Sequence, residues 1–351
     1  MSAPGHPLWR DLEHVYARAG GLLEELRGAR IFVTGGTGFV GRWMLESLLW
    51  ASDQQALDVR VTVLSRHPET FARRAPRVTG HEAVTMLEGD VTTFGFPTGE
   101  FGHVLHLAKE PEHDLNAAGE DAAALAPGTA RVLAFAASHG TAKLLFTSSG
   151  AVYGPQPMGC ERLSEDHAGA PSPDDPHAAY ASAKRAGELL CTSASHDSAV
   201  RTRIARCFAI VGPYMDFDGA YAIGNFIRDA VGRPAVEVAG DGTPLRSYLY
   251  AADLAIWLWT ILFSGETATP YNVGSPDPIS IADLAHLVAR TAGGGKPVHI
   301  AQQSSRDPAA PSRYIPDTSR AASQLGLTPQ VELEDAIGRT TRWYRSTRLP
   351  A

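Results

Sequence analysis

The chain has 351 residues, of which 44% are hydrophobic, and a formal net charge of −7 at pH 7. Its length suits one large α/β domain with a smaller addition, and its hydrophobic content is ordinary for a protein that buries a sizeable core. The negative charge and the lack of a basic run disfavour nucleic acid as a partner.

The expected compartment follows from the segments that the sequence lacks. Residues 1–10 are polar, without the apolar core of a secretory signal. The most apolar run, residues 254–263, is about half of what spans a bilayer, so we expect a buried helix. The three cysteines are scattered and lack ligand spacing. These features predict a cytoplasmic protein with no membrane partner, no disulfide framework and no metal site.

The chain is expected to begin with a helix from about residue 8 to residue 27, within an N-terminal extension (residues 1–28) that docks on the main domain. A β-prone stretch at residues 30–33 leads into a glycine-rich turn, and residues 43–50 have the character of a helix. Strand, glycine turn and helix in this order are the context in which such a turn binds phosphate.

Three glycines of this turn have separate roles in a dinucleotide site. Gly35 allows the chain to reverse sharply, Gly38 lets the backbone approach a pyrophosphate, and Gly41 lets the helix pack closely on the strand. The unpaired N–H groups at the start of the helix then face the anion. The predicted cofactor contacts of this turn are Gly35, Thr37, Gly38, Phe39, Val40 and Gly41.

Two later strands are expected to end at the adenosine. The strand over residues 59–64 is followed by Arg66, where an acidic residue would bind the ribose 2′-hydroxyl of NAD and an arginine can accept the 2′-phosphate of NADP. Arg66 therefore favours NADP over NAD, unless it stacks on adenine or points to solvent. The strand over residues 84–91 ends with Asp90 and Val91, and the Asp90 carboxylate can either accept from the adenine amino group or cap a helix.

A fourth strand, residues 103–108, should also end over the cofactor, with Leu107 and the small Ala108 leaving space. His106 in this strand is interpreted as a packed residue rather than a catalytic one. A helix over residues 129–138 and a fifth strand over residues 143–149 follow. Alternating strands and helices through five units predict a parallel, doubly wound sheet whose strand ends form one ligand-binding rim.

The chemistry is expected from a serine at the end of strand five and a Tyr-Lys pair on the next helix. Tyr180 and Lys184 are four residues apart and so share one helical face. The lysine ammonium favours the phenolate of the tyrosine, which can take a proton from a sugar hydroxyl while hydride leaves the same carbon. Ser149 would hydrogen-bond the reacting oxygen, and Lys184 would also bind the nicotinamide ribose.

With these motifs the chain resembles the extended short-chain dehydrogenase/reductase family, specifically the NAD(P)-dependent nucleotide-sugar epimerases and dehydratases. The resemblance covers roughly residues 29–345. The glycine turn matches the family's cofactor turn, residues 90–91 its adenine site, and Ser149, Tyr180 and Lys184 its catalytic triad. The resemblance implies a nucleotide-diphosphate sugar as substrate and a homodimer as the assembly.

The resemblance also implies an architecture: a Rossmann-type doubly wound parallel sheet with a smaller, partly discontinuous C-terminal substrate lobe. Residues 29–213 would form the NAD(P)-binding domain, to which residues 248–274 return, and residues 214–247 and 275–345 would form the lobe. Arg246 and Arg313 are expected to bind the diphosphate of the substrate, since a guanidinium holds phosphate oxygens bidentately.

The chain departs from the family at the sugar. The 4,6-dehydratases of the family follow the triad serine or threonine with an Asp-Glu pair, and its decarboxylases usually place a glutamate there, but this chain has Gly150 and Ala151. These small residues look more like an epimerase, whose keto sugar must rotate in the site, or like a ketoreductase. Gly150 and Ala209, which replaces a substrate-contacting asparagine of the family, are expected to line the sugar.

One loop offers replacement acid–base groups. Cys160 and Glu161, with Glu165 nearby, lie between Ser149 and Tyr180, in a loop that passes over the substrate in this family. A thiol and a carboxylate there could together drive epimerisation or elimination. The alternative is that Cys160 is an ordinary loop residue and Glu161 a solvated charge.

Together these features predict a nucleotide-sugar epimerase that acts through transient oxidation at sugar C4. The alternatives are a 4,6-type dehydratase with atypical acid–base residues and a net 4-ketosugar reductase, which would fit Arg66 and an exchangeable NADPH. A non-enzymatic sensor or scaffold is disfavoured, because the whole triad is present.

Overall fold

The computed structural model describes residues 6–108, 118–172, 175, 178–219, 221–301 and 312–348, with side chains left aside for 118–124 and 348. The chain forms two compact units. The first contains Met1–Val152, Pro171–Arg206 and Ala255–Tyr271, and the second contains Tyr153–Ala170, Cys207–Leu254 and Asn272–Ala351. The division therefore falls after Arg206 rather than after residue 213, and it groups the loop Tyr153–Ala170 with the second unit.

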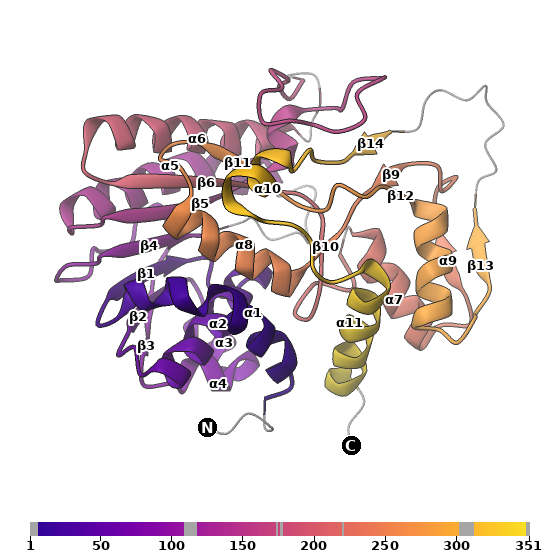
Figure 1. Ribbon diagram of the computed structural model, residues 1–351, viewed down its shortest axis with the longest axis horizontal. Coiled ribbons are helices and arrows are strands. Elements are labelled where there is room, and N and C mark those ends of the chain that lie inside the picture. Colours follow the sequence, from indigo (N-terminus) through magenta and orange to yellow (C-terminus); the bar gives the residue numbers. More distant parts are fainter. Residues whose placement is uncertain are drawn as a thin grey trace. The chain divides into compact units, whose positions relative to one another are not determined.

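A seven-stranded parallel sheet is the centre of the fold (Figure 1), with the strand order β11-β6-β5-β4-β1-β2-β3. Because β1 has both β2 and β4 as parallel neighbours, the chain winds outward in both directions from β1. This order confirms the predicted Rossmann-type doubly wound sheet. The strands are β1 (Arg30–Thr34), β2 (Arg60–Ser65), β3 (Val84–Glu88), β4 (His103–His106), β5 (Lys143–Ser149), β6 (Arg201–Cys207) and β11 (Pro270–Val273).

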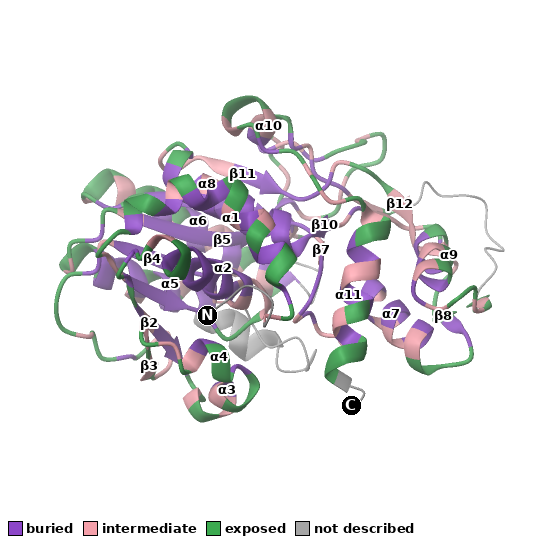
Figure 2. Ribbon diagram, turned by 60° about the horizontal axis from the view of Figure 1, so that its bottom comes forward, coloured by how far each residue is buried: buried purple, intermediate pink, exposed green. Residues whose placement is uncertain are grey.

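Helices cover both faces of this sheet, so its central strands are buried (Figure 2). Alternate residues of β1 face the two sides: Phe32 packs against Phe135 of α5, with ring centroids 4.5 Å apart, whereas Val33 and Leu45 of α2 both lie beside Gly36. The helices of the first unit are α1 (Trp9–Leu23), η2 (Glu24–Leu26), α2 (Phe39–Gln55), α3 (Pro68–Arg74), α4 (Pro76–Thr79), α5 (Ala118–Ser138) and α6 (Ala178–Asp197). α8 (Ala251–Ser264) and η3 (Gly150–Tyr153) continue from one unit into the other.

The segment before helix α1 is joined to α2 by a buried carboxylate. Glu46 of α2 accepts from His6 Nε2 at 3.0 Å and from Arg42 Nε at 2.9 Å. Burial acts to raise the pKa of Glu46, but these two partners outweigh it and the pKa is lowered. The N-terminal segment is therefore fixed to the helix that follows the glycine turn.

Helix α5 is longer than predicted. It begins at Ala118 rather than near residue 129, and Pro127 lies inside it. The local sequence disfavours a helix across Pro127 and Gly128, but a side chain at Gly128 would lie 2.8 Å from Val91 Cγ1, so the glycine permits close packing there. Tertiary packing overrides the local propensity at this point.

In its described residues the second unit contains short strands and, besides the start of α8, four helices. Its strand pairs are β7 (Ile210–Val211) with β10 (Leu249–Tyr250), β8 (Val236–Val238) with β13 (Val298–Ile300), and β9 (Leu245–Arg246) with both β12 (Ile279–Ser280) and β14 (Arg313–Tyr314). Its helices are α7 (Ala222–Gly232), α9 (Ile281–Thr291), α10 (Ser319–Leu325) and α11 (Leu333–Arg348). None of the helices in the described part of the chain has the length and apolar character needed to cross a membrane.

His103 at the start of β4 gives a testable pH dependence of stability. Its pKa is lowered to about 4, because burial disfavours the charged ring and Lys143 adds positive charge nearby. The unfolded chain protonates this ring near pH 6.5, so between pH 6.5 and pH 4 the folded state binds fewer protons and loses stability as the pH falls. Between pH 7 and pH 5, we expect the free energy of unfolding to fall by about 2 kcal/mol less in His103→Leu than in the wild type.

Urea denaturation of both proteins at the two pH values measures this difference. His196→Leu is the matched control for replacing a histidine by leucine, because His196 is exposed on α6 and the burial argument does not apply to it. Equal slopes for the wild type and His103→Leu would contradict the burial argument.

Candidate active site

The glycine turn lies at the carboxyl end of β1, where its three glycines meet different constraints. Gly35 has a φ of +69°, and a Cβ on it would lie 2.4 Å from the carbonyl of Leu107. A Cβ on Gly41 would lie 2.1 Å from the carbonyl oxygen of Gly35. A Cβ on Gly38 would meet nothing closer than 3.5 Å. Protein packing therefore requires Gly35 and Gly41, whereas Gly38 leaves space that the protein itself does not fill.

This arrangement fits the pyrophosphate of a dinucleotide. Thr37 and Gly38 are exposed, and Gly38 is the N-cap of α2, whose first turn begins with the half-buried Phe39 and Val40. The first N–H groups of a helix have no acceptor within it, and the N-terminal end carries partial positive charge. A pyrophosphate over Gly38 would accept from these donors, so the chain's own residues match the predicted cofactor.

A pair of alanine substitutions separates the two kinds of glycine. Gly38→Ala should keep the melting temperature of the protein and weaken NADH or NADPH binding about ten-fold or more, because its methyl group occupies the pyrophosphate space. Gly41→Ala should lower the melting temperature itself, because its methyl group collides with backbone. Thermal unfolding and cofactor fluorescence titration measure the two effects, and normal cofactor binding by Gly38→Ala would contradict the assignment.

The two predicted adenosine contacts lie at the ends of β2 and β3. Asp90 Oδ1 accepts from the N–H of Thr92 at 2.8 Å and from its hydroxyl at 2.5 Å. These bonds lower the pKa of Asp90, and the positive charge of Arg66 adds to the effect. Asp90 therefore stabilises a turn rather than the start of a helix, while Arg66 is exposed. The adenine contact of Asp90 stays a prediction.

The predicted catalytic pair, Tyr180 and Lys184, lies on one face of α6, as its spacing indicates. Lys184 is buried, and its Nζ donates to the carbonyl of Ala108 at 3.0 Å and to that of Thr147 at 2.9 Å. Its Nζ lies 5.9 Å from the ring centroid of the half-buried Tyr180. The ends of β4 and β5 thus hold the ammonium next to the phenol.

Ser149 is the last residue of β5 and belongs to the same unit as the pair. Its Oγ accepts from the N–H of Ala151 at 3.2 Å, which leaves the hydroxyl proton available for donation. Gly150 is buried and Ala151 half-buried in η3. Neither side chain can exchange a proton, so the structure places no ionisable group at the two positions that follow the serine.

His106 is fully enclosed and links three elements below the rim. Its Nδ1 lies 2.6 Å from Thr34 Oγ1 and its Nε2 2.9 Å from Thr129 Oγ1. Burial lowers its pKa to about 3, with a further contribution from the charge of Lys184. The ring is therefore neutral and structural, as expected of a packed strand residue.

A buried carboxylate beneath the pair was not expected from the sequence. Glu188 of α6 accepts from Ser148 and from Arg206 of β6. Its spacing from Lys184 is again four residues, so the helical periodicity that relates Tyr180 to Lys184 also contained this signal.

The predicted diphosphate ligands lie in the second unit, on neighbouring parallel strands. Arg246 of β9 pairs in register with Tyr314 of β14, and Arg313 pairs with Leu245. Because successive side chains of a strand alternate, this register puts the two arginines on opposite faces of the small sheet. Arg246 Nη1 donates to the carbonyls of Leu245 (2.8 Å) and Ser312 (3.2 Å). The strands bring the two backbones together, but not the two side chains.

The loop Tyr153–Ala170 contains the suggested replacement acid–base groups. The thiol of Cys160 donates to the carbonyl of Arg162 at 3.1 Å, and Glu161 is exposed. Burial raises the pKa of Glu165, whose Oε1 accepts from the N–H of Asn272. Glu165 is therefore part of the loop's packing, while a catalytic role of Cys160 and Glu161 stays a prediction.

Ala209, the other predicted sugar contact, lies in the second unit directly before β7. It is half-buried, and its carbonyl accepts from the N–H of Leu249 at 3.1 Å. Its methyl side chain has no polar group, so the backbone is its only means of hydrogen-bonding a sugar.

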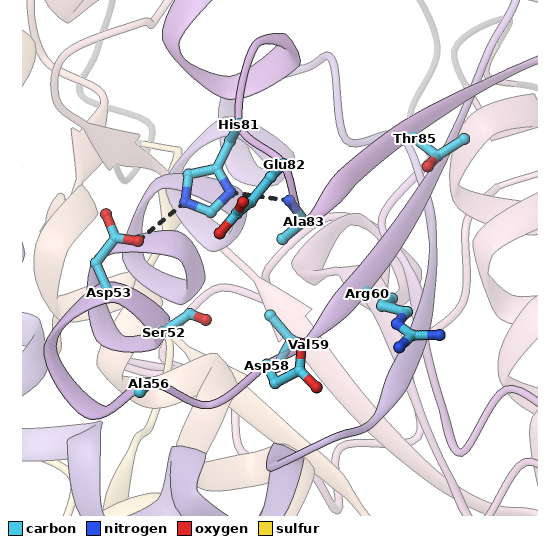
Figure 3. Close-up of a pocket in the computed structure, with 10 residues that line it drawn as sticks. All are labelled: Ser52, Asp53, Ala56, Asp58, Val59, Arg60, His81, Glu82, Ala83 and Thr85. Atoms are coloured by element: carbon cyan, nitrogen blue, oxygen red, sulfur yellow. Dashed lines mark hydrogen bonds and ion pairs between the residues drawn. The ribbon is translucent and has the colours of Figure 1, made fainter.

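A surface pocket of about 610 Å³ lies away from these residues (Figure 3). Its lining comes from the end of α2 and from the residues before β2 and β3, where His81 Nε2 lies 3.0 Å from Asp53. In a parallel sheet these amino ends are opposite the rim that contains Gly38 and Ser149. Within the described ranges, no group of three or more His, Cys, Asp or Glu side chains could hold a metal ion, at this pocket or elsewhere.

Comparison with known proteins identifies the family of the chain. Residues 31–274 match the model of the NAD dependent epimerase/dehydratase family. The chain belongs to this family. UDP-glucuronic acid decarboxylase 1 of Xenopus tropicalis is 29% identical over 324 residues, which are 92% of this chain and 74% of that protein. The resemblance predicted from the motifs is confirmed at the level of the family.

Two solved structures share the fold. An epimerase from Methanothermobacter thermautotrophicus aligns with a TM-score of 0.76 and 20% identity, covering 95% of this chain and 96% of that one. The dTDP-glucose 4,6-dehydratase DesIV from Streptomyces venezuelae, with NAD and TYD bound, aligns with a TM-score of 0.73 and 22% identity, covering 91% and 98%. Family membership makes this chain an enzyme of the NAD-dependent nucleotide-sugar epimerase/dehydratase group.

Proposed function

We propose that this member of the NAD-dependent epimerase/dehydratase family is a nucleotide-sugar 4-epimerase. The observation that supports this reaction most directly is the combination of a complete Ser149, Tyr180 and Lys184 set with Gly150 and Ala151. The triad provides for oxidation and re-reduction at one carbon. The two residues after the serine offer no side chain that could eliminate water or decarboxylate the sugar.

The proposed chemistry uses the triad as follows. Tyr180, as the phenolate, takes the proton of the sugar C4 hydroxyl, and the Ser149 hydroxyl donates a hydrogen bond to the same oxygen while keeping its own proton. Lys184, fixed by two backbone carbonyls, keeps its positive charge beside the phenol and favours the phenolate. The bound nicotinamide supplies the acceptance and return of hydride. When Tyr180 gives its proton back, the oxygen on C4 becomes a hydroxyl again.

Gly150 has no side chain, which suits the step in which the keto sugar turns within the site. A keto sugar must turn its other face toward the hydride donor before reduction, and bulky or charged side chains would obstruct the turn. We propose that Gly150 and Ala209 border the sugar and that Arg246 and Arg313 bind the diphosphate. Arg313 would have to reach the diphosphate from the other face of its strand. Cys160 and Glu161 stay candidates for assistance in this step.

The cofactor form is a second part of the proposal. Arg66 is exposed at the end of β2, where its guanidinium could take a 2′-phosphate, and this favours NADP. The relative DesIV was solved with NAD. Fluorescence titration with NADH and NADPH tests the point: Arg66→Ala should weaken NADPH binding and spare NADH.

We further propose a cytoplasmic homodimer that pairs through α5 and α6. Leu189 of α6 is 67% exposed, and the outward residues of α5 include the small Ala130 and Ala134. An exposed leucine on α6 and exposed small residues on α5 would suit close packing of these helices between subunits. Light scattering should then show a dimer for the wild type and a monomer for Leu189→Arg.

Incubation with a panel of nucleotide sugars tests the reaction. An epimerase should purify with bound nicotinamide and turn over without added cofactor, giving a product of the same mass with inverted C4, identified by NMR. A product absorbing near 320 nm in alkali would instead identify a 4,6-dehydratase. With a keto sugar as substrate, consumption of NADPH in an amount equal to the sugar reduced would identify a reductase. Either of these results would overturn the epimerase assignment.

A further inference from the structure

Glu188 continues the face of α6 that contains the catalytic pair. Tyr180, Lys184 and Glu188 follow one another at intervals of four residues, so their side chains leave the helix on one side. The proposed reaction gives Glu188 no proton to transfer. Its contacts therefore need another explanation.

The carboxylate of Glu188 is held by two neighbouring strands. Ser148 Oγ donates to Oε1 at 2.5 Å, and Arg206 donates to Oε1 through Nε at 2.9 Å and to Oε2 through Nη2 at 2.7 Å. Both ionised side chains are 7% exposed. The pair is thus bidentate and enclosed, an arrangement that fixes direction as well as distance.

The contacts of Lys184 and Glu188 together determine how α6 lies on the sheet. Lys184 reaches the carbonyls of Ala108 and Thr147, and Glu188 reaches β5 and β6 one turn further along. Between them, a Cβ on Gly187 would lie 2.6 Å from the Phe146 ring, so α6 lies directly on β5. Translation or rotation of the helix would break several of these contacts at once.

Ser148 connects this arrangement to the reacting end of β5. Phe146 and Ser148 point toward α6, and the next residue, Ser149, is the predicted donor to the sugar oxygen. The same hydrogen bond therefore fixes the strand that carries Ser149 and the helix that carries Tyr180.

We propose that Glu188 is a positioning residue, which with Ser148 and Arg206 sets the placement of α6 over β5 and so the geometry of Tyr180, Lys184 and Ser149. The inference rests on the proposed function. A purely structural ion pair makes a different prediction, because a buried pair can often be replaced by apolar residues without loss of stability. If the pair positions the site, variants that disturb it should lose turnover while their melting temperature stays near that of the wild type.

The decisive variant is Ser148→Ala, which removes one hydroxyl and leaves the ion pair. We expect kcat per folded molecule to fall about ten-fold, since misplaced reacting groups are costly, while KM and the dissociation constant of NADH stay within about two-fold. The apolar double variant Glu188→Met/Arg206→Met should show the same fall at a near-normal melting temperature. Thr192→Ala is the control, because its hydroxyl donates to the Glu188 backbone carbonyl on the exposed side of α6 and should change nothing.

A second readout does not depend on turnover. The ultraviolet titration of Tyr180, taken as the difference between each protein and its Tyr180→Phe partner, should have a shifted midpoint in Ser148→Ala, because displacement of α6 on β5 changes the surroundings of the phenol at the end of β5. Unchanged kcat and an unchanged midpoint in Ser148→Ala would overturn the proposal. If the wild type converts no nucleotide sugar, the proposed function fails, and the midpoint alone then decides the positioning role.

Discussion

Replacing Tyr180 with phenylalanine is expected to lower kcat by about 10²–10⁴-fold, the range for loss of a general acid–base group. In the proposed mechanism the phenol exchanges a proton with the sugar hydroxyl, and phenylalanine keeps the ring while removing the hydroxyl. Lys184 retains its carbonyl partners in the variant, so the cofactor should still bind. Steady-state turnover with the substrate found in the panel measures the loss, and cofactor titration checks that the site is intact.

The matched control for this variant is Tyr16→Phe. Tyr16 is a half-buried residue of the N-terminal helix α1, far along the chain from the proposed triad, and should keep full turnover. If Tyr180→Phe retained more than about a tenth of wild-type kcat, the acid–base assignment would be refuted.

The largest loss of stability outside the glycine turn is expected from Asn272→Ala. Asn272 is fully buried; its Nδ2 donates to the carbonyls of Leu163 (2.7 Å) and Asp317 (2.9 Å), and its Oδ1 accepts from the Tyr153 hydroxyl (2.8 Å). Alanine would leave three enclosed polar groups without this partner. We expect the free energy of unfolding to fall by about 3 kcal/mol, measured by urea denaturation.

Asn225→Ala is the control for the loss of an asparagine. Its Nδ2 donates to the carbonyl of Gly219 at 3.1 Å and its Oδ1 accepts from Arg228 Nη1 at 3.1 Å. Both bonds are only partly buried, so water can replace the lost partner and the cost should be about 1 kcal/mol or less. Tyr153→Phe, which removes one bond of the Asn272 set, should fall between the two. Equal stability of Asn272→Ala and wild type would contradict the view that this residue fixes the loop Tyr153–Ala170.

The elements of the dinucleotide fold could be predicted because their signals are local. Residues that are adjacent in the sequence are enough to recognise the alternation of β-prone runs with helical segments and the glycine turn after residue 33. The N-terminal helix and the fifth strand were located within a few residues of α1 and β5. The start of α5 was missed, because Pro127 and Gly128 obscure a helix that packing against Val91 supports.

The candidate catalytic set was proposed from the Tyr180–Lys184 spacing together with its position after strand five and the glycine turn. The structure places Tyr180 and Lys184 on one face of α6, and the catalytic roles of the set stay a prediction. The periodicity of four residues relates Tyr180 to Lys184, and the end of strand five marks Ser149. The sequence could not show that Lys184 binds the carbonyls of Ala108 and Thr147, because these contacts join residues 76 and 37 positions apart. The same applies to the Glu188–Arg206 pair.

The arrangement of the residues predicted to bind the substrate was harder to predict than that of the candidate catalytic residues, for a physical reason. The two arginines were assigned by resemblance, and the register of β9 and β14 then put Arg246 and Arg313 on opposite faces. A strand register depends on pairing partners far apart in sequence, and a shift of one residue reverses every side chain. Gly150 and Ala151, in contrast, could be interpreted without a structure, because neither residue has a side chain that can exchange a proton.

The central claim is that sugar C4 is oxidised and re-reduced within one protein molecule without net use of nicotinamide. The most direct test incubates the purified protein, without added cofactor, with nucleotide hexoses deuterated at C4. We predict a C4 epimer that keeps the deuterium on C4, with no change in total oxidised and reduced nicotinamide. A product that has lost the C4 deuterium to free NAD(P), or no epimer from any nucleotide hexose, would contradict it.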